Sequence, residues 1–206
     1  NGGATLSGST KSLHDSRVVN LGGTSTWSAG SIDFVGTSSL VNTAGGVLTT
    51  NFNGAMNLIS GSGSFTNAGT FTKSAGTGTT TIGVALNNTG TVNVDSGTLS
   101  ATGGGTSTGA WNVPVGTALN FGGGTQNLNA GTNVSAAGTV GFSGGATSFN
   151  AGTYSVTGTT QVNGGTANFN AAASTNLLNL SSGVLSGSGT LTASGLTTWS
   201  GGVING

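Results

Sequence analysis

The chain has 206 residues, of which three are Lys or Arg, three are Asp or Glu and 42 are Gly, and its formal net charge is zero. Charged residues make up 3% of the chain, where about 25% is usual. We expect no nucleic-acid partner and no membrane insertion, because the chain lacks a basic surface and any apolar run of roughly 18 residues. The absence of cysteine excludes disulfides and thiolate metal sites.

Glycine returns every six to eight residues in GTVGFSGGATSFNAGTYSVTG, residues 138–158. Similar spacing is found at residues 65–76 and 87–105 and near the C-terminus. Between the glycines, apolar residues alternate with polar ones, which is the period of a strand with one buried face. The residues predicted to point inward are, in chain order, Ile32 with Phe34, Val92 with Val94, Leu99 with Ala101, Trp111 with Val113, Leu119 with Phe121, Val140 with Phe142, Tyr154 with Val156 and Ala167 with Phe169.

Strands of four or five residues joined by single glycine corners favour a bend in one direction over a series of hairpins. Three such strands close a coil of about 20 residues, within the range typical of solenoids. We therefore predict an all-β right-handed parallel β-helix, with residues 1–206 as one solenoid segment. An antiparallel β-sandwich is the competing interpretation, but its turns recur at longer spacing and use Asp, Pro and Asn.

Two features bear on how the coils are arranged. The segments STWSAGSIDF (25–34) and TTWSGGVING (197–206) are alike, which suggests one facet in distant coils. The stretches at residues 101–113 and 174–183 exceed the repeat, and we expect corner bulges or loops there.

The charged cluster KSLHDSR at residues 11–17 holds Lys11, His14, Asp15 and Arg17. A His-Asp pair beside serines invites comparison with a hydrolytic triad. A triad, however, gathers residues from separate places, and no G-x-S-x-G motif is present. We interpret the cluster as a solvated loop or an interruption of the coils, of undetermined role.

Acid–base catalysis would have to use Asp15, Asp33 or Asp95, since Glu is absent. Asp33 and Asp95 are expected at outward strand or corner positions. The GGGT runs at residues 103–106 and 122–125 lack the Asp of calcium-binding repeats and the Lys of a phosphate loop. The sequence thus predicts no enzyme, no catalytic, cofactor-binding or metal-binding residues, and no cofactor.

Lys73 is expected to lie inward or at a corner because it alternates with Phe71. Beside an Asn, and with a buried acid, it could form an isopeptide crosslink. Threonine pairs such as Thr70 with Thr72 resemble the T-x-T rows of ice-binding solenoids, but Thr, Ser and Asn mix without a sustained register. Ice or carbohydrate binding by outward Thr, Ser and Asn faces therefore stays as the alternative function.

The segments SGVLSGSGTLTASGLTTWSGG (182–202) and GTVNVDSGTLSATGGG (90–105) resemble the β-solenoid stalk repeats of giant bacterial surface and secreted adhesins, of the filamentous-haemagglutinin-like and autotransporter-passenger kinds. The resemblance implies an extracellular or cell-surface structural or adhesive protein, a stalk or fibre-forming subunit. It carries over no site residues. Both ends of the sequence stay within the repeat pattern. We therefore expect the coils to self-associate end to end or to meet neighbouring coils of a parent protein, with a surface or glycan ligand as a further partner.

Overall fold

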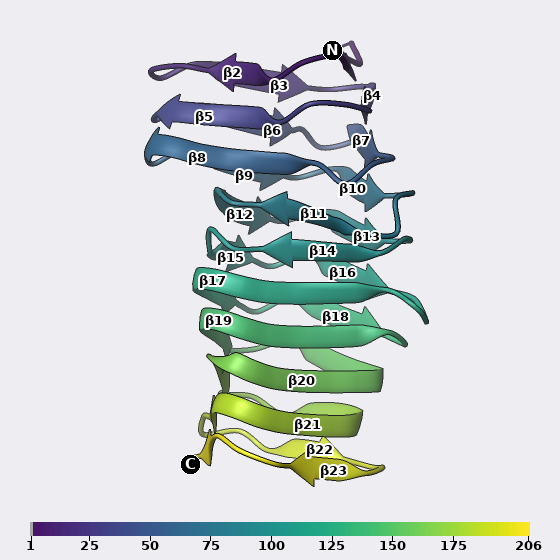
Figure 1. Ribbon diagram of the computed structural model, residues 1–206, viewed down its shortest axis with the longest axis vertical. Coiled ribbons are helices and arrows are strands. Elements are labelled where there is room, and N and C mark those ends of the chain that lie inside the picture. The colour runs from purple at the N-terminus through teal and green to yellow at the C-terminus, as the bar shows by residue number, and fades with distance from the viewer. Residues whose placement is uncertain (1) are drawn as a thin grey trace.

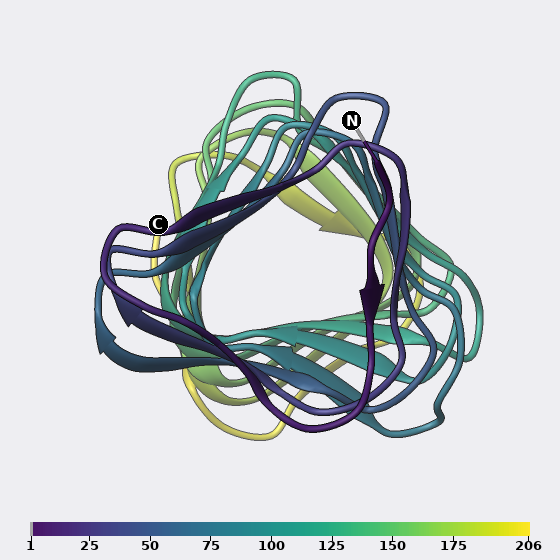
Figure 2. The ribbon, with the colours of Figure 1, turned by 90° about the horizontal axis from the view of Figure 1, so that it is seen from above.

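The computed structural model describes residues 2–206, which form a right-handed β-solenoid of about 10 coils with about 21 residues each (Figure 1). Seen from the N-terminal end, the chain runs clockwise as it recedes, around a rounded triangle (Figure 2). The described residues contain no helix long and apolar enough to cross a membrane. The fold class predicted from the glycine spacing is confirmed.

Three walls make up each coil, and most strands belong to one wall. Wall 1 holds β1 (Thr5–Leu6), β4 (Thr24–Trp27), β7 (Val47–Thr50), β10 (Thr70–Lys73), β13 (Thr91–Val94), β16 (Ala110–Val113), β18 (Asn133–Ala136) and β22 (Leu191–Ala193). Wall 2 holds β2 (Lys11–Leu13), β5 (Ile32–Gly36), β8 (Ala55–Gly61), β11 (Thr79–Ile82), β14 (Thr98–Ala101) and β23 (Thr197–Trp199). Wall 3 holds β3 (Val18–Leu21), β6 (Ser39–Asn42), β9 (Ser64–Asn67), β12 (Ala85–Asn88), β15 (Gly105–Ser107) and β24 (Val203–Ile204).

Four longer strands continue around the corners. β17 (Ala118–Leu128) and β19 (Thr139–Phe149) cover walls 2 and 3, while β20 (Thr153–Phe169) and β21 (Ala173–Ser186) contribute to all three walls. All pairing is parallel between equivalent strands of successive coils. Phe71, for example, pairs with Leu48 on one side and with Val92 on the other. Equivalent residues therefore stack in columns along the rod.

The inward columns carry the core, and the alternation predicted from the sequence is confirmed. Every predicted inward residue is buried, as are Phe65, Phe71 and Phe149. Aromatic rings contact one another between coils; the rings of Phe121 and Phe142 are stacked, with their centroids 5.6 Å apart and their planes inclined by 28°. Stacking contacts of this kind add stability beyond the burial of area. Thr91 and Asn93, which alternate with Val92, face outward and are half-buried.

Glycine is required at the corner between walls 2 and 3 because successive coils meet there closely. Gly145 has φ 62°, and a Cβ built on it would lie 2.1 Å from the carbonyl oxygen of Gly124. Gly124 itself has φ 63°, and a Cβ built on it would lie 2.6 Å from the nitrogen of Gly104. A side chain at Gly124 or Gly145 would clash with the backbone of the preceding coil and strain its own backbone.

Coil length varies, but not where the sequence led us to expect. Residues 174–183 lie within strand β21, and residues 101–113 contain the end of β14 together with β15 and β16, so neither stretch adds residues to its coil. The expected bulges are present in residues 174–183, where the register of β21 against β20 shifts at two corners. Thr159 pairs with Leu177, only 18 positions on, because the corners shorten there. The longest coil joins Met56 to Ile82, 26 positions on, and its extra residues lie at the corner between β8 and β9 and between β10 and β11.

The two tryptophan segments lie on different walls, which corrects the expectation of a shared facet. Trp27 pairs with Leu6 and Thr50 in wall 1, whereas Trp199 pairs with Leu180 in wall 2. Each indole Nε1 donates to a carbonyl three residues later, on Gly30 at 2.8 Å and on Gly202 at 3.3 Å. The two similar segments therefore form the same type of turn at two different corners of the solenoid.

Candidate functional site

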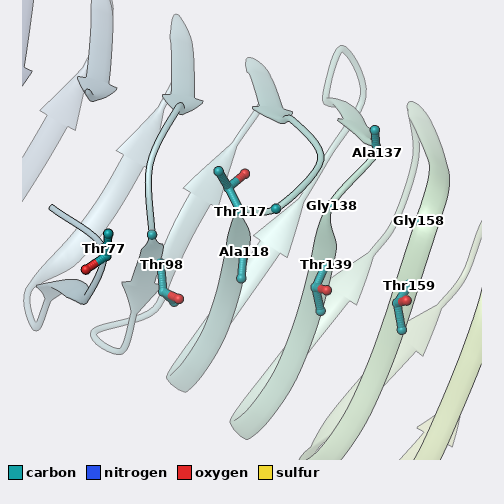
Figure 3. A pocket seen from close by; sticks show the side chains of 11 residues that line it. Thr77, Thr98, Thr117, Ala118, Ala137, Gly138, Thr139, Gly158 and Thr159 are labelled. Carbon is teal, nitrogen blue, oxygen red and sulfur yellow. The ribbon is translucent and has the colours of Figure 1, made fainter. Parts of the chain in front are cut away.

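Wall 2 is hollowed along the rod axis in the middle coils, and we call this hollow the axial groove. Its first part has a volume of about 390 Å³ and lies at the corner with wall 1. Figure 3 shows Thr98, Ala118, Thr139 and Thr159 at the same level of successive strands. The remaining lining residues are Thr77, Gly97, Gly116, Thr117, Ala137, Gly138 and Gly158.

The second part of the groove, of about 270 Å³, shares Thr98, Ala118 and Thr139 with the first. Its other lining residues are Thr79, Ser100, Leu119, Asn120, Gly141, Ser143, Gln161 and Asn163. The hollow arises because outward positions that carry threonine or an amide in neighbouring coils carry Ala118 or Gly141 here. Small residues at these positions leave room above the sheet.

Hydrogen bonds fix the side chain of Asn120 in the second part of the axial groove. The Asn120 Nδ2 donates to the hydroxyls of Ser100 at 3.2 Å and Ser143 at 2.8 Å. By contrast, among residues 2–206 the side chains of Gln161 and Asn163 form no hydrogen bond with another protein group. Their amides are free to meet a ligand.

The groove is electrically neutral. Residues 96–206 contain no Asp, Glu, Lys, Arg or His, so the whole C-terminal half of the rod carries no ionisable group of these kinds. Asp95, at the corner after β13, is the charged residue that precedes this half. A ligand in this groove would therefore be held by hydrogen bonds and van der Waals contacts.

The charged cluster at residues 11–17 is part strand and part turn. Lys11 begins β2, and its Nζ donates to the carbonyls of Ser7 and Ser9 and, at a very short distance, to that of Ala29. His14, Asp15 and Arg17 are exposed at the corner between walls 2 and 3, where Asp15 has φ 59°. The structure brings no residues together there as a triad would require.

The three carboxylates lie apart along the rod. Asp33 faces outward on β5 and accepts a hydrogen bond from Asn57 Nδ2 at 2.8 Å. Asp15 belongs to the first coil, and Asp95 to the coil that contains β13. Within residues 2–206, no group of three or more His, Asp or Glu side chains is placed to hold a metal ion.

Lys73 points inward from β10 and is fully buried. Its Nζ donates to the carbonyls of Ala75 at 3.0 Å and Gly76 at 2.9 Å and to Asn53 Oδ1 at 3.2 Å. Burial lowers the pKa of this lysine. These hydrogen bonds hold the corner between β10 and β11 in place. An isopeptide crosslink to Asn53 would need a buried acid, and within residues 2–206 no acid is among the contacts of the Lys73 Nζ.

A buried asparagine column in wall 3 was missed from the sequence. Asn42, Asn67 and Asn88 are fully buried, and each Nδ2 reaches the next coil: Asn42 to Asn67 Oδ1 at 2.7 Å and Asn67 to Asn88 Oδ1 at 2.9 Å. The signal was present, because each follows a core residue at the same spacing of two, as in Phe65 and Asn67.

The outward threonines of wall 1 do not form a sustained ladder. β4 and β10 each present two threonines, at Thr24 and Thr26 and at Thr70 and Thr72. Later strands present asparagine, alanine and serine at the paired positions, as in β16 and β18. The mixed pattern seen in the sequence is confirmed.

The terminal coils expose positions that are covered elsewhere. In the last coil, Trp199 is 59% and Ile204 45% exposed, although their columns are buried in the preceding coils at Leu180 and Leu185.

No family model matches the chain, and the comparisons with curated proteins and with solved structures also give no match.

Proposed function

We propose that this chain is a non-enzymatic structural and adhesive β-solenoid, a shaft that holds other parts of a surface or secreted assembly apart. The observation that carries the proposal is the uninterrupted parallel ladder of wall 1, which runs from β1 to β22. Because each coil contacts its neighbours along three walls, the rod resists bending and extends by addition of coils.

Further coils are the partners that this function requires. The strands of each terminal coil pair on one side only within residues 2–206, so they can accept an in-register strand from a second copy or from a further segment. Apolar residues at inward positions of the last coil favour such contact.

An extracellular or cell-surface location is part of the proposal. Uncharged hydroxyl and amide side chains hydrate this surface. The absence of cysteine makes the fold independent of redox conditions. The resemblance to adhesin stalk repeats supports the same location.

Electron microscopy of the negatively stained chain at neutral pH tests the shaft. We expect straight rods one solenoid wide, single or joined end to end into filaments; particles without a constant width would contradict the proposal. Antibodies against the chain should label intact producing cells or their medium. Labelling only after the cells are permeabilised would contradict the surface location.

A further inference from the structure

The axial groove offers neutral hydrogen-bonding groups one or two strand spacings apart along the rod. Among residues 2–206, the hydroxyls of Thr98, Thr139 and Thr159 are not engaged with other protein groups. They lie in one column, since Thr98 pairs with Ala118, Ala118 with Thr139, and Thr139 with Thr159. At about 4.8 Å per strand, the column spans about 14 Å along the rod.

A second observation places a donor in the floor. Ser100 is 7% exposed, and its hydroxyl accepts a hydrogen bond from Asn120. This leaves the Ser100 proton without an acceptor among the described residues. Buried hydroxyl groups are normally satisfied, so the proton of Ser100 is available to a ligand that enters the groove.

These features define the chemistry of the occupant. A charged ligand would find no counter-ion, because the lining residues and all residues after Asp95 are neutral. Threonine, serine and amide groups both donate and accept, which suits a ligand that carries many hydroxyls. The repeat along the axis suits a polymer whose unit is about as long as one strand spacing, and a pyranose ring has this length.

We propose that the axial groove binds an extended, neutral polysaccharide chain laid along the rod, with about one sugar ring per coil. The inference rests on the adhesive part of the proposed function and gives its ligand class. Thr139, at the junction of the two parts of the groove, is central to the contact, and Gln161 and Asn163 flank it.

Isothermal titration calorimetry with cellohexaose and chitohexaose, together with sedimentation with insoluble cellulose and chitin, tests the proposal. We expect at least one of these neutral β-linked glycans to bind, and Thr139→Arg to weaken binding at least tenfold because its side chain fills the groove. Thr139→Val, which keeps the shape but removes the hydroxyl, should weaken it several-fold.

Thr153→Arg is the matched control, because Thr153 is an exposed outward threonine on wall 1. It should bind glycan as the unaltered chain does. Absence of binding by all four glycans would overturn the proposal, as would equal losses in the two arginine variants. Dimers that Thr139→Arg dissociates, without glycan binding, would assign the groove to a second copy. Rods intact by microscopy in any of these cases would leave the shaft function standing.

Discussion

The buried asparagine column allows a sharp comparison between Asn67 and Asn42. Replacement of Asn67 by leucine removes its hydrogen bonds with Asn42 Nδ2, Asn88 Oδ1 and the Thr91 carbonyl. The Asn88 Oδ1 would then be buried without a donor, at a cost of about 1 to 3 kcal/mol, and each further lost bond costs about 1 kcal/mol. We expect Asn67→Leu to destabilise the chain by about 3 to 5 kcal/mol.

Asn42 stands at the N-terminal end of the column, where its own Oδ1 is already buried without a partner. Asn42→Leu removes that unsatisfied oxygen while it leaves Asn67 Oδ1 without a donor. The two effects nearly cancel, and the lost bond to the Thr70 carbonyl leaves a net cost of about 1 kcal/mol. The stability gained by burying a leucine side chain is similar at both sites, so it does not affect the difference between the two variants.

Guanidinium unfolding followed by tryptophan fluorescence measures the difference. Trp111 is well placed as a reporter, because its Nε1 donates to Ser107 Oγ at 2.9 Å and Ser107 pairs with Asn88. Asn67→Leu should lower the midpoint clearly more than Asn42→Leu. Equal shifts, or a more stable Asn67→Leu, would refute the continuous chain of amide hydrogen bonds.

Three further outcomes follow from the corners and the core. Gly145→Ala should lower the melting temperature more than Gly116→Ala. Both glycines have positive φ, but a Cβ on Gly145 clashes with Gly124, whereas a Cβ on Gly116 meets nothing within 4 Å. Similar losses in the two variants would show that backbone strain, and not the clash between coils, sets the cost. Gln126→Met should stabilise the chain by about 1 kcal/mol, since both polar atoms of the Gln126 amide are buried without a partner; a loss of stability in urea unfolding would argue against this environment. Burial raises the pKa of Tyr154, so the unfolded chain loses this proton first, and stability should fall as pH rises above about 10. Tyr154→Phe should flatten that fall, and an unchanged alkaline slope would contradict the burial.

Much of the fold could be predicted because two short-range rules operate throughout. Alternation identified inward residues such as Val140 and Phe142, and glycine marked corners where only glycine fits, as at Gly145. Register between coils depends instead on how many residues each corner absorbs. That number is not encoded locally, so Trp27 and Trp199 were assigned to one wall when they occupy two.

The candidate site depended still more on stacking. The groove forms because Ala118 and Gly141 fall in columns whose neighbours are larger, and a column is visible only once the coils are in register. That the Asn67 side chain points inward could have been predicted from Phe65, because residues two apart on a strand point to the same side. Composition obscured it, because asparagine is abundant in the chain and is usually a solvated residue.

The stacking of the coils is tested most directly by the distance between the first and last coils on wall 2. The chain has no cysteine, so Thr10→Cys and Thr198→Cys, both exposed, give a single pair of spin labels. Nine strand spacings of about 4.8 Å separate the two positions, or about 43 Å. Double electron–electron resonance should give a narrow distribution near this distance, whereas a much shorter distance or a broad distribution would contradict a rigid solenoid shaft.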